Sequence, residues 1–135
     1  MVDMKPKVLT IDDDAEFAEL IKYNLVKQGC EVLVAGNGLM GLQLARLSLP
    51  DVILLDIMLP DLDGLSVCQI LRTQPSTKQI PVFILSALDQ SWMATRGTRV
   101  QFEKYCKKPV DLKVLGASIR TAAEEYHLRV AAALA

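Results

Sequence analysis

Short runs of apolar residues alternate along the chain with longer segments in which apolar residues recur every three or four positions. The short runs, rich in β-branched residues, are typical of buried strands, and the longer spacing is typical of amphipathic helices. Strands are predicted at residues 7–12, 31–35, 52–56, 81–85 and 102–107. Helices are predicted at residues 15–28, 38–48, 65–73 and 89–99, and from residue 112 toward residue 135.

Capping residues and helix-breaking residues set most of these boundaries. Asp14, Asn37 and Asp111 are suitable N-caps, and Gly29 ends the first helix. The first helix carries an apolar face that one polar residue interrupts: Phe17, Leu20, Ile21, Asn24 and Leu25. The segment of the fourth helix is polar and contains Gly97, so it has the lowest helix propensity of the five.

The strict alternation of strands and helices implies a parallel sheet with helices on both faces and right-handed crossovers. Ligands of such sheets bind at the carboxyl ends of the strands, where the strand order reverses. With 135 residues, 51% of them hydrophobic, the chain is expected to form one domain with one core.

Charge and composition argue against several classes of function. The net charge of -1 argues against nucleic-acid binding as the main function of the chain. The apolar stretches are too short to span a membrane, and the N-terminus lacks the apolar core of a signal peptide, so we expect a cytoplasmic protein. Cys30, Cys68 and Cys106 have no metal-binding spacing and are interpreted as small hydrophobic residues in a reducing compartment.

Acidic residues follow or end two of the predicted strands. Asp12 and Asp13 follow the first apolar run, and Asp56 ends the third. Three carboxylates gathered at one edge of the sheet would repel one another unless a hard divalent cation lay among them. Mg²⁺ prefers such oxygen ligands, and Asp56 would then be placed to attack phosphorus as a nucleophile.

Two further strand ends carry groups suited to phosphoryl chemistry. Ser86, followed by the small Ala87, comes after the fourth strand, and Lys108, followed by Pro109, comes after the fifth. A lysine and a metal ion would neutralise the charge on phosphoryl oxygens, and a hydroxyl would bond to one of them. The sequence therefore predicts a Mg²⁺ site that carries out phosphate chemistry on Asp56.

The chain resembles the receiver domain of bacterial two-component response regulators over about residues 7–129. The matching motifs are Ile11-Asp12-Asp13-Asp14, Asp56-Ile57-Met58-Leu59-Pro60-Asp61-Leu62-Asp63-Gly64, Leu85-Ser86-Ala87 and Tyr105-Cys106-Lys107-Lys108-Pro109. The resemblance implies a flavodoxin-like α/β fold, in which a doubly wound, five-stranded parallel sheet has the strand order 2-1-3-4-5.

The resemblance also implies how the acidic residues act. Asp56 would be the phosphoacceptor, receiving the phosphoryl group from a histidine kinase or a histidine phosphotransfer protein. Mg²⁺ would be bound directly by Asp13 and Asp56, through water by Asp12, and by the main-chain carbonyl of Met58.

The remaining strand-end residues would respond to the phosphoryl group. Ser86 and Tyr105 would be the switch pair, with Ala87 as the small residue beside Ser86. Lys108 would contact the phosphoryl group, and the Lys108–Pro109 peptide would be cis. The switched surface would then bind a downstream effector domain or protein, and the chain itself would not be an enzyme.

One segment departs from the family pattern. Receivers usually place a Gly-Ala pair shortly before the fifth strand, where this chain has Gln101-Phe102. A bulky aromatic residue in place of a small one must find a packing site, so we expect the face built from the fourth helix, fifth strand and fifth helix to differ in shape.

Simpler interpretations accompany several of these residues. Ser86 would suit an N-cap of the fourth helix, and Lys107 competes with Lys108 for the site. Trp92 is interpreted as a packing residue, and His127, the only histidine, as an exposed one, so the chain is expected to accept phosphate rather than donate it from histidine. Four charged residues are interpreted as loop acids or as part of a solvated face: Asp61, Asp63, Arg96 and Arg99.

Three alternative functions differ in what they require. A phosphatase of another aspartate-nucleophile family would need an acid two residues after Asp56, where this chain has Met58. A receiver that binds without phosphate would normally have lost an acidic or lysine residue, and none is lost here. A flavin or nucleotide binder would need a glycine-rich loop after the first strand, which is absent from the sequence.

The long final helix suggests how the chain is organised. We assign residues 1–129 to the receiver domain and residues 130–135 to a helical extension or the start of a linker. A homodimer through this helix is a possible arrangement, and no contact of this domain with nucleic acid or membrane is expected.

Overall fold

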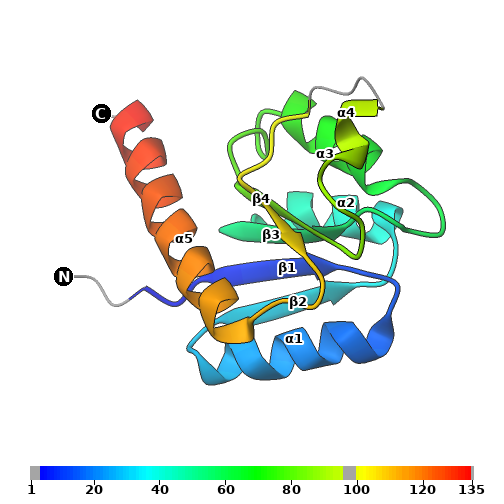
Figure 1. Cartoon of the computed structure of the whole chain (residues 1–135). Coiled ribbons are helices and arrows are strands. Elements are labelled where there is room, and N and C mark those ends of the chain that lie inside the picture. The colour runs from blue at the N-terminus through cyan, green and yellow to red at the C-terminus, as the bar shows by residue number, and fades with distance from the viewer. Residues whose placement is uncertain (1–3, 96–99, 135) are drawn as a thin grey trace.

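Five parallel strands form one sheet in the computed structural model, which describes residues 4–95 and 100–134. The strands are β1 (Lys7–Ile11), β2 (Glu31–Ala35), β3 (Val52–Asp56), β4 (Val82–Ser86) and β5 (Lys104–Lys107). Their order is β2-β1-β3-β4-β5, which confirms the predicted fold and places the reversal of strand order between β1 and β3 (Figure 1).

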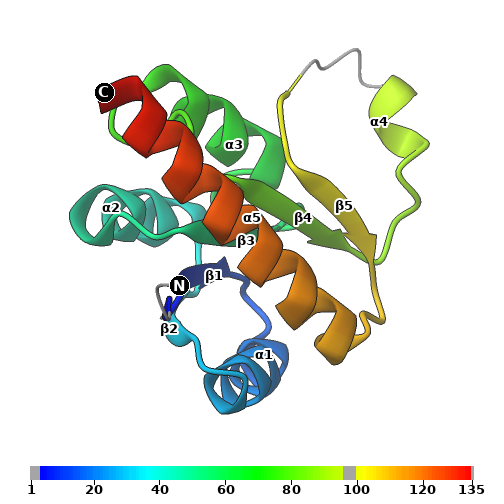
Figure 2. The ribbon, with the colours of Figure 1, turned by 90° about the vertical axis from the view of Figure 1, so that its left-hand side faces the viewer.

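The helices cover both faces of the sheet. They are α1 (Ala15–Lys27), α2 (Gly38–Ser48), α3 (Gly64–Thr73), α4 (Trp92–Thr95) and α5 (Leu112–Leu134). Helices α1 and α5 lie on one face and α2 and α3 on the other, as the two views in Figures 1 and 2 show. No helix within the described residues is long and apolar enough to cross a lipid bilayer.

The central strands are buried on both faces, which explains why their sequences are continuously apolar. Side chains from alternate positions pack against α2 and α3: Leu9, Ile11, Ile53, Leu55 and Ile84. The intervening positions pack against α1 and α5: Val8, Val52, Leu54, Phe83 and Leu85. Each fully buried side chain of this size contributes roughly 1.5–3 kcal/mol to folding, so the two cores hold β1, β3 and β4 firmly in register.

Three details of the predicted elements were wrong. The fourth helix begins at Trp92 rather than at residue 89, and residues 96–99 of that prediction lie outside the described part of the chain. Strand β5 begins at Lys104, because Phe102 precedes the pairing with β4. Leu20 is 50% exposed on α1, whereas Ile21 and Leu25 of the same predicted face are buried, together with Ala18.

Helix α5 is continuous through the division proposed between residues 129 and 130. Near this point its His127 Nε2 lies 2.6 Å from Asp51 Oδ1, at the amino end of β3. His127 is exposed, as expected, and lies at the opposite edge of the sheet from the acidic residues. The helix therefore remains attached to the domain well beyond its buried middle turns.

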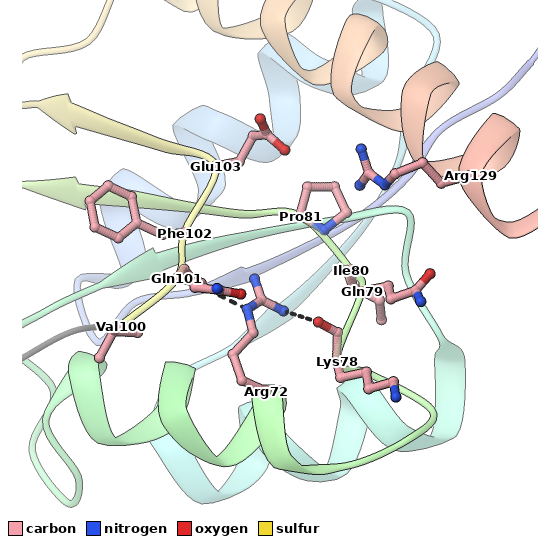
Figure 3. A pocket seen from close by; sticks show the side chains of 10 residues that line it. All are labelled: Arg72, Lys78, Gln79, Ile80, Pro81, Val100, Gln101, Phe102, Glu103 and Arg129. Atoms are coloured by element: carbon pink, nitrogen blue, oxygen red, sulfur yellow. Dashed lines mark hydrogen bonds between the residues drawn. The ribbon is translucent and has the colours of Figure 1, made fainter.

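The segment that departs from the family pattern is held by an arginine from α3. Arg72 donates from Nε to the Gln101 carbonyl (2.9 Å) and from Nη1 to the Lys78 carbonyl (3.0 Å), as Figure 3 shows. This clamp borders a cavity of about 480 Å³ at the amino edge of β4 and β5. Phe102 packs against the core formed with α2 and α3, which is where the bulky residue is accommodated.

A glycine at the start of α3 permits close approach to the end of β3. A Cβ on Gly64 would overlap the Asp56 carbonyl oxygen and lie 2.7 Å from Ile57 Cα, and neither backbone atom can move without disturbing the strand end. A Cβ on Gly36, in the loop before α2, would have open space around it.

We therefore expect Gly64→Ala to lower the free energy of unfolding by about 1–3 kcal/mol through overpacking. Gly36→Ala should change it by no more than about 0.5 kcal/mol. Urea unfolding of the two variants and the native protein measures both values. Equal stabilities for the two alanine variants would contradict this account of the Gly64 contact.

Candidate functional site

Three carboxylates converge at the carboxyl edge of the sheet. One oxygen from each of Asp12, Asp13 and Asp56 lies within 4.8 Å of the other two. Asp12 and Asp56 are buried, with Asp12 only 3% exposed, whereas Asp13 is exposed. The structure thus brings together the three acidic residues that the sequence analysis predicted to meet.

The sheet itself creates this convergence. Ile11 of β1 is paired with Leu55 of β3, so the next residues, Asp12 and Asp56, leave the two strands side by side. The Asp12 amide continues the ladder on the other side by donating to the Ala35 carbonyl (3.0 Å). The two carboxylates are therefore fixed by strand pairing and not by mobile loops.

Local hydrogen bonds orient the buried carboxylates. Asp12 Oδ1 accepts from the Asp14 amide (2.9 Å), and Asp56 Oδ1 accepts from the Met58 amide (3.1 Å). Asp14 caps α1 by accepting from the Phe17 amide (3.1 Å), as predicted, which leaves Asp13 facing solvent beside the site. Each of the buried acids is left with its second oxygen toward the cluster.

Lys108 supplies the positive charge of the site. Its Nζ lies 3.1 Å from Asp12 Oδ2 and 3.3 Å from Asp56 Oδ2. It also lies 4.2 Å from the centroid of the Phe17 ring, whose face favours a cation. The Lys108 amide donates to the Ser86 carbonyl (2.7 Å), and the Lys108–Pro109 peptide is cis.

The neighbouring lysine points elsewhere. Lys107 Nζ forms an exposed ion pair with Asp89 (2.8 Å), away from the cluster of Asp12, Asp13 and Asp56. Adjacent strand residues point to opposite faces, so only one of the two lysines could enter the site. The geometry therefore places Lys108 rather than Lys107 among the acids.

Burial and charge act in opposite directions on these groups. Burial raises the pKa of the Asp12 carboxyl, and the negative charge of Asp56 raises it further, while the Asp14 amide and Lys108 lower it. Burial disfavours the charged form of Lys108, but Asp56 and Asp12 outweigh this effect and raise its pKa. Three carboxyl groups surround the ammonium of Lys108, so the negative charge that they can carry exceeds its positive charge and the site favours a further cation.

Ser86 and Tyr105 lie beside the same edge on β4 and β5. Ser86 is buried at the end of β4, and its Oγ accepts from the Leu88 amide (3.1 Å). Because α4 begins only at Trp92, Ser86 is not its N-cap. The half-buried Tyr105 donates its hydroxyl to the Leu88 carbonyl (2.7 Å) and accepts from Trp92 Nε1 (2.8 Å).

A family model for the response regulator receiver domain matches residues 8–120, which is most of the chain. The chain belongs to this family. The match includes the strand ends that carry the acids, Ser86 and Lys108, and it favours the receiver over the alternative of an unrelated aspartate-nucleophile phosphatase.

Curated relatives of this receiver are longer proteins. It is 40% identical over 115 residues to the DNA-binding dual master transcriptional regulator RpaA of a Synechocystis species, covering 85% of this chain and 48% of RpaA. It is 34% identical over 117 residues to the alkaline phosphatase synthesis transcriptional regulatory protein PhoP of Bacillus subtilis, covering 87% of this chain and 48% of PhoP. The receiver thus spans about half the length of these relatives.

Solved receivers share its architecture. The receiver domain of the Francisella response regulator 1452 superimposes with a TM-score of 0.81 at 36% identity, covering 90% of this chain and 98% of that domain. The BeF3-activated DrrB receiver domain superimposes with a TM-score of 0.74 at 26% identity, covering 90% of this chain and 99% of that one. These likenesses extend over almost the whole described domain.

Three residues near the site have roles that the sequence analysis did not identify. Asp61, read as a loop acid, accepts from the Gly38 amide (2.8 Å) and the Leu39 amide (2.9 Å) and so joins the loop after β3 to the start of α2. Trp92, interpreted as packing, hydrogen-bonds to Tyr105. No local pattern marks either contact, because each joins residues that are distant in sequence. Asp63 is an N-cap, accepting from the Ser66 amide (2.9 Å).

The Asp61 contact makes a pH-dependent contribution to stability. Hydrogen bonds from the Gly38 and Leu39 amides lower the pKa of Asp61 below its ordinary value of 3.8. The stabilisation is therefore complete above pH 3.8 and is lost as the pH falls through the lower pKa of the folded state.

We expect Asp61→Asn to unfold at a lower urea concentration than the native protein at pH 7, because the charge-assisted hydrogen bonds are weakened. The difference between the urea midpoints of the variant and the native protein should become smaller as the pH falls below 3.8. Glu19→Gln, on the exposed side of α1, is the control and should unfold at the same urea concentration as the native protein at each pH. A gap that stays constant with pH would contradict the assignment.

Proposed function

We propose that this receiver is a phosphorylation switch in which Asp56 is the phosphoacceptor. The observation that carries the proposal is the position of Asp56 Oδ2, which lies 3.3 Å from Lys108 Nζ at the edge where β3 ends. Asp12 and Asp13 flank it, and the family match covers the whole constellation.

The donor is a phosphohistidine on a histidine kinase or a histidine phosphotransfer protein. A carboxylate oxygen of Asp56 attacks phosphorus and forms a P–O bond while the P–N bond to the donor imidazole breaks. The electron pair of that bond returns to the imidazole nitrogen, which takes a proton from solvent. Lys108 is placed to balance the negative charge on the phosphoryl oxygens, as in other phosphoryl transfers.

Mg²⁺ fits the donor set of this site. Carboxylate oxygens are its preferred protein ligands, and the cluster has an excess of negative charge that Lys108 alone does not balance. Asp13, Asp56 and the main-chain carbonyl of Met58 would hold the ion, with Asp12 acting through water. When bound, Mg²⁺ supplies positive charge beside the phosphoryl oxygens.

The response begins at the end of β4. The Ser86 hydroxyl is proposed to turn toward a phosphoryl oxygen, and the small side chain of Ala87 leaves room beside it. Tyr105 would then shift with the loop to which its hydroxyl is bonded, because phosphorylation biases an equilibrium between two arrangements of this surface. The surface formed by α4, β5 and α5 is the proposed output.

The output partner is proposed to be a downstream effector domain or protein, since the receiver spans only about half of its curated relatives. Residues 1–129 form the receiver in this proposal, and residues 130–135 continue α5 as an extension or linker. A homodimer through α5 is compatible with its exposed Leu128 and Leu134. The domain works in the cytoplasm, binds neither nucleic acid nor membrane itself, and is not an enzyme.

The direct test is phosphorylation with acetyl phosphate and Mg²⁺, followed by intact-mass measurement. We expect one acid-stable, base-labile phosphoryl adduct on the native protein and none on Asp56→Asn. Asp63→Asn, which replaces another acid near the site and preserves an N-cap, should carry the adduct like the native protein. An adduct on Asp56→Asn, or none on the native protein, would refute the proposal.

A second prediction concerns the metal. Asp13 is exposed, so Asp13→Asn should fold normally while removing a proposed direct ligand. We expect the Mg²⁺ concentration needed for half-maximal adduct formation to rise about tenfold or more. An unchanged requirement would show that Asp13 does not bind the metal.

A further inference from the structure

Tyr105 is held from three directions by residues outside the acidic cluster. Its hydroxyl donates to the Leu88 carbonyl (2.7 Å) and accepts from the indole Nε1 of Trp92 (2.8 Å). Its ring meets the ring of Phe102 in an edge-to-face contact, with centroids 6.4 Å apart and planes at 62°. The tyrosine is therefore fixed both at its hydroxyl and along its ring.

These contacts continue to the end of β4. The Leu88 amide donates to Ser86 Oγ (3.1 Å), so the backbone of Leu88 is bonded to Ser86 on its amide side and to Tyr105 on its carbonyl side. Ser86 directly follows Leu85, which is paired with Asp56 in the sheet. A continuous chain of contacts thus runs from the proposed phosphoacceptor edge to α4.

The indole of Trp92 determines which groups donate and which accept in this series of hydrogen bonds. An indole N–H only donates, so the Tyr105 hydroxyl must accept from Trp92 and use its single hydrogen for the Leu88 carbonyl. A residue without such a donor would remove one of the two hydrogen bonds that orient the hydroxyl and leave the bond to the Leu88 carbonyl. Phe102, which stands where the family has a small residue, adds the aromatic contact on the other side.

We propose that Trp92 is a positioning residue of the switch: its indole N–H holds the Tyr105 hydroxyl on the Leu88 carbonyl and couples α4 to Ser86. The proposal rests on the phosphorylation switch described above. A movement of Ser86 would be passed through Leu88 to Tyr105, and from Tyr105 to Trp92 and α4. Because Trp92 and Phe102 both hold Tyr105, its position would depend on the position of the loop that contains Leu88.

Trp92 is the only tryptophan of the chain, so its indole N–H can report on this coupling by NMR. In a ¹⁵N-labelled sample its indole N–H produces a single resonance that needs no assignment. We would measure its exchange with water, and its chemical shift before and after adding Mg²⁺ and beryllofluoride, a phosphoryl analogue. The variants are Tyr105→Phe, which removes only the hydroxyl, and Tyr23→Phe, which makes the same change at an exposed tyrosine on α1.

We expect the indole N–H of Tyr105→Phe to exchange about fivefold faster than that of the native protein, the effect of losing one hydrogen bond. Beryllofluoride should shift the resonance of the native protein and of Tyr23→Phe, and should shift that of Tyr105→Phe much less. Equal exchange rates, or equal shifts in all three proteins, would overturn the proposal.

The two proposals can fail separately. Among the described residues, Trp92 contacts Tyr105 and the core beside α3 and not the acidic cluster, so Trp92→Phe should accept a phosphoryl group from acetyl phosphate as the native protein does. If the native protein forms no adduct, the proposed function fails, while the exchange rates still test the Trp92–Tyr105 bond. If the adduct forms but Tyr105→Phe leaves the indole unaffected, only the positioning role fails.

Discussion

The site depends on placing mutually repelling carboxylates side by side at the end of a rigid sheet. Pairing between β1 and β3 fixes Asp12 next to Asp56, and both residues are buried. Lys108, which follows β5, reaches both acids, so one ammonium links the edge strand of the sheet to its centre. The residual negative charge favours a bound cation at this edge, and that cation would offset the charge of the proposed phosphoryl group.

The buried core and the responsive surface occupy different parts of the molecule. Strands β3 and β4 are buried throughout, whereas β5 and the loop after β4 are partly exposed and are joined by side-chain hydrogen bonds. A surface held by a few such bonds can change its arrangement at small cost, while the packed core cannot. The acids therefore lie on the packed part of the molecule, and Tyr105 and Trp92 lie on the partly exposed part that we propose responds.

Sequence patterns predicted the sheet and the acidic cluster because both depend on local order. Apolar runs mark the strands, and Asp12 and Asp56 at their carboxyl ends meet because β1 and β3 are neighbours, an order that the family resemblance implied. The pattern failed where tertiary contacts decide the structure: Leu20 has the spacing of a core residue but is exposed, and the fourth helix starts at Trp92. The contacts of Asp61 with α2 and of Trp92 with Tyr105 join distant segments, so no spacing could reveal them.

The most direct test of the central claim is a crystal structure of the protein with Mg²⁺ and beryllofluoride. The account predicts the metal among Asp13, Asp56 and the Met58 carbonyl, with beryllium bonded to Asp56 and Lys108 contacting a fluorine. Ser86 would then point toward the fluorines. Beryllofluoride on another residue, or Mg²⁺ bound away from the three carboxylates, would contradict the account.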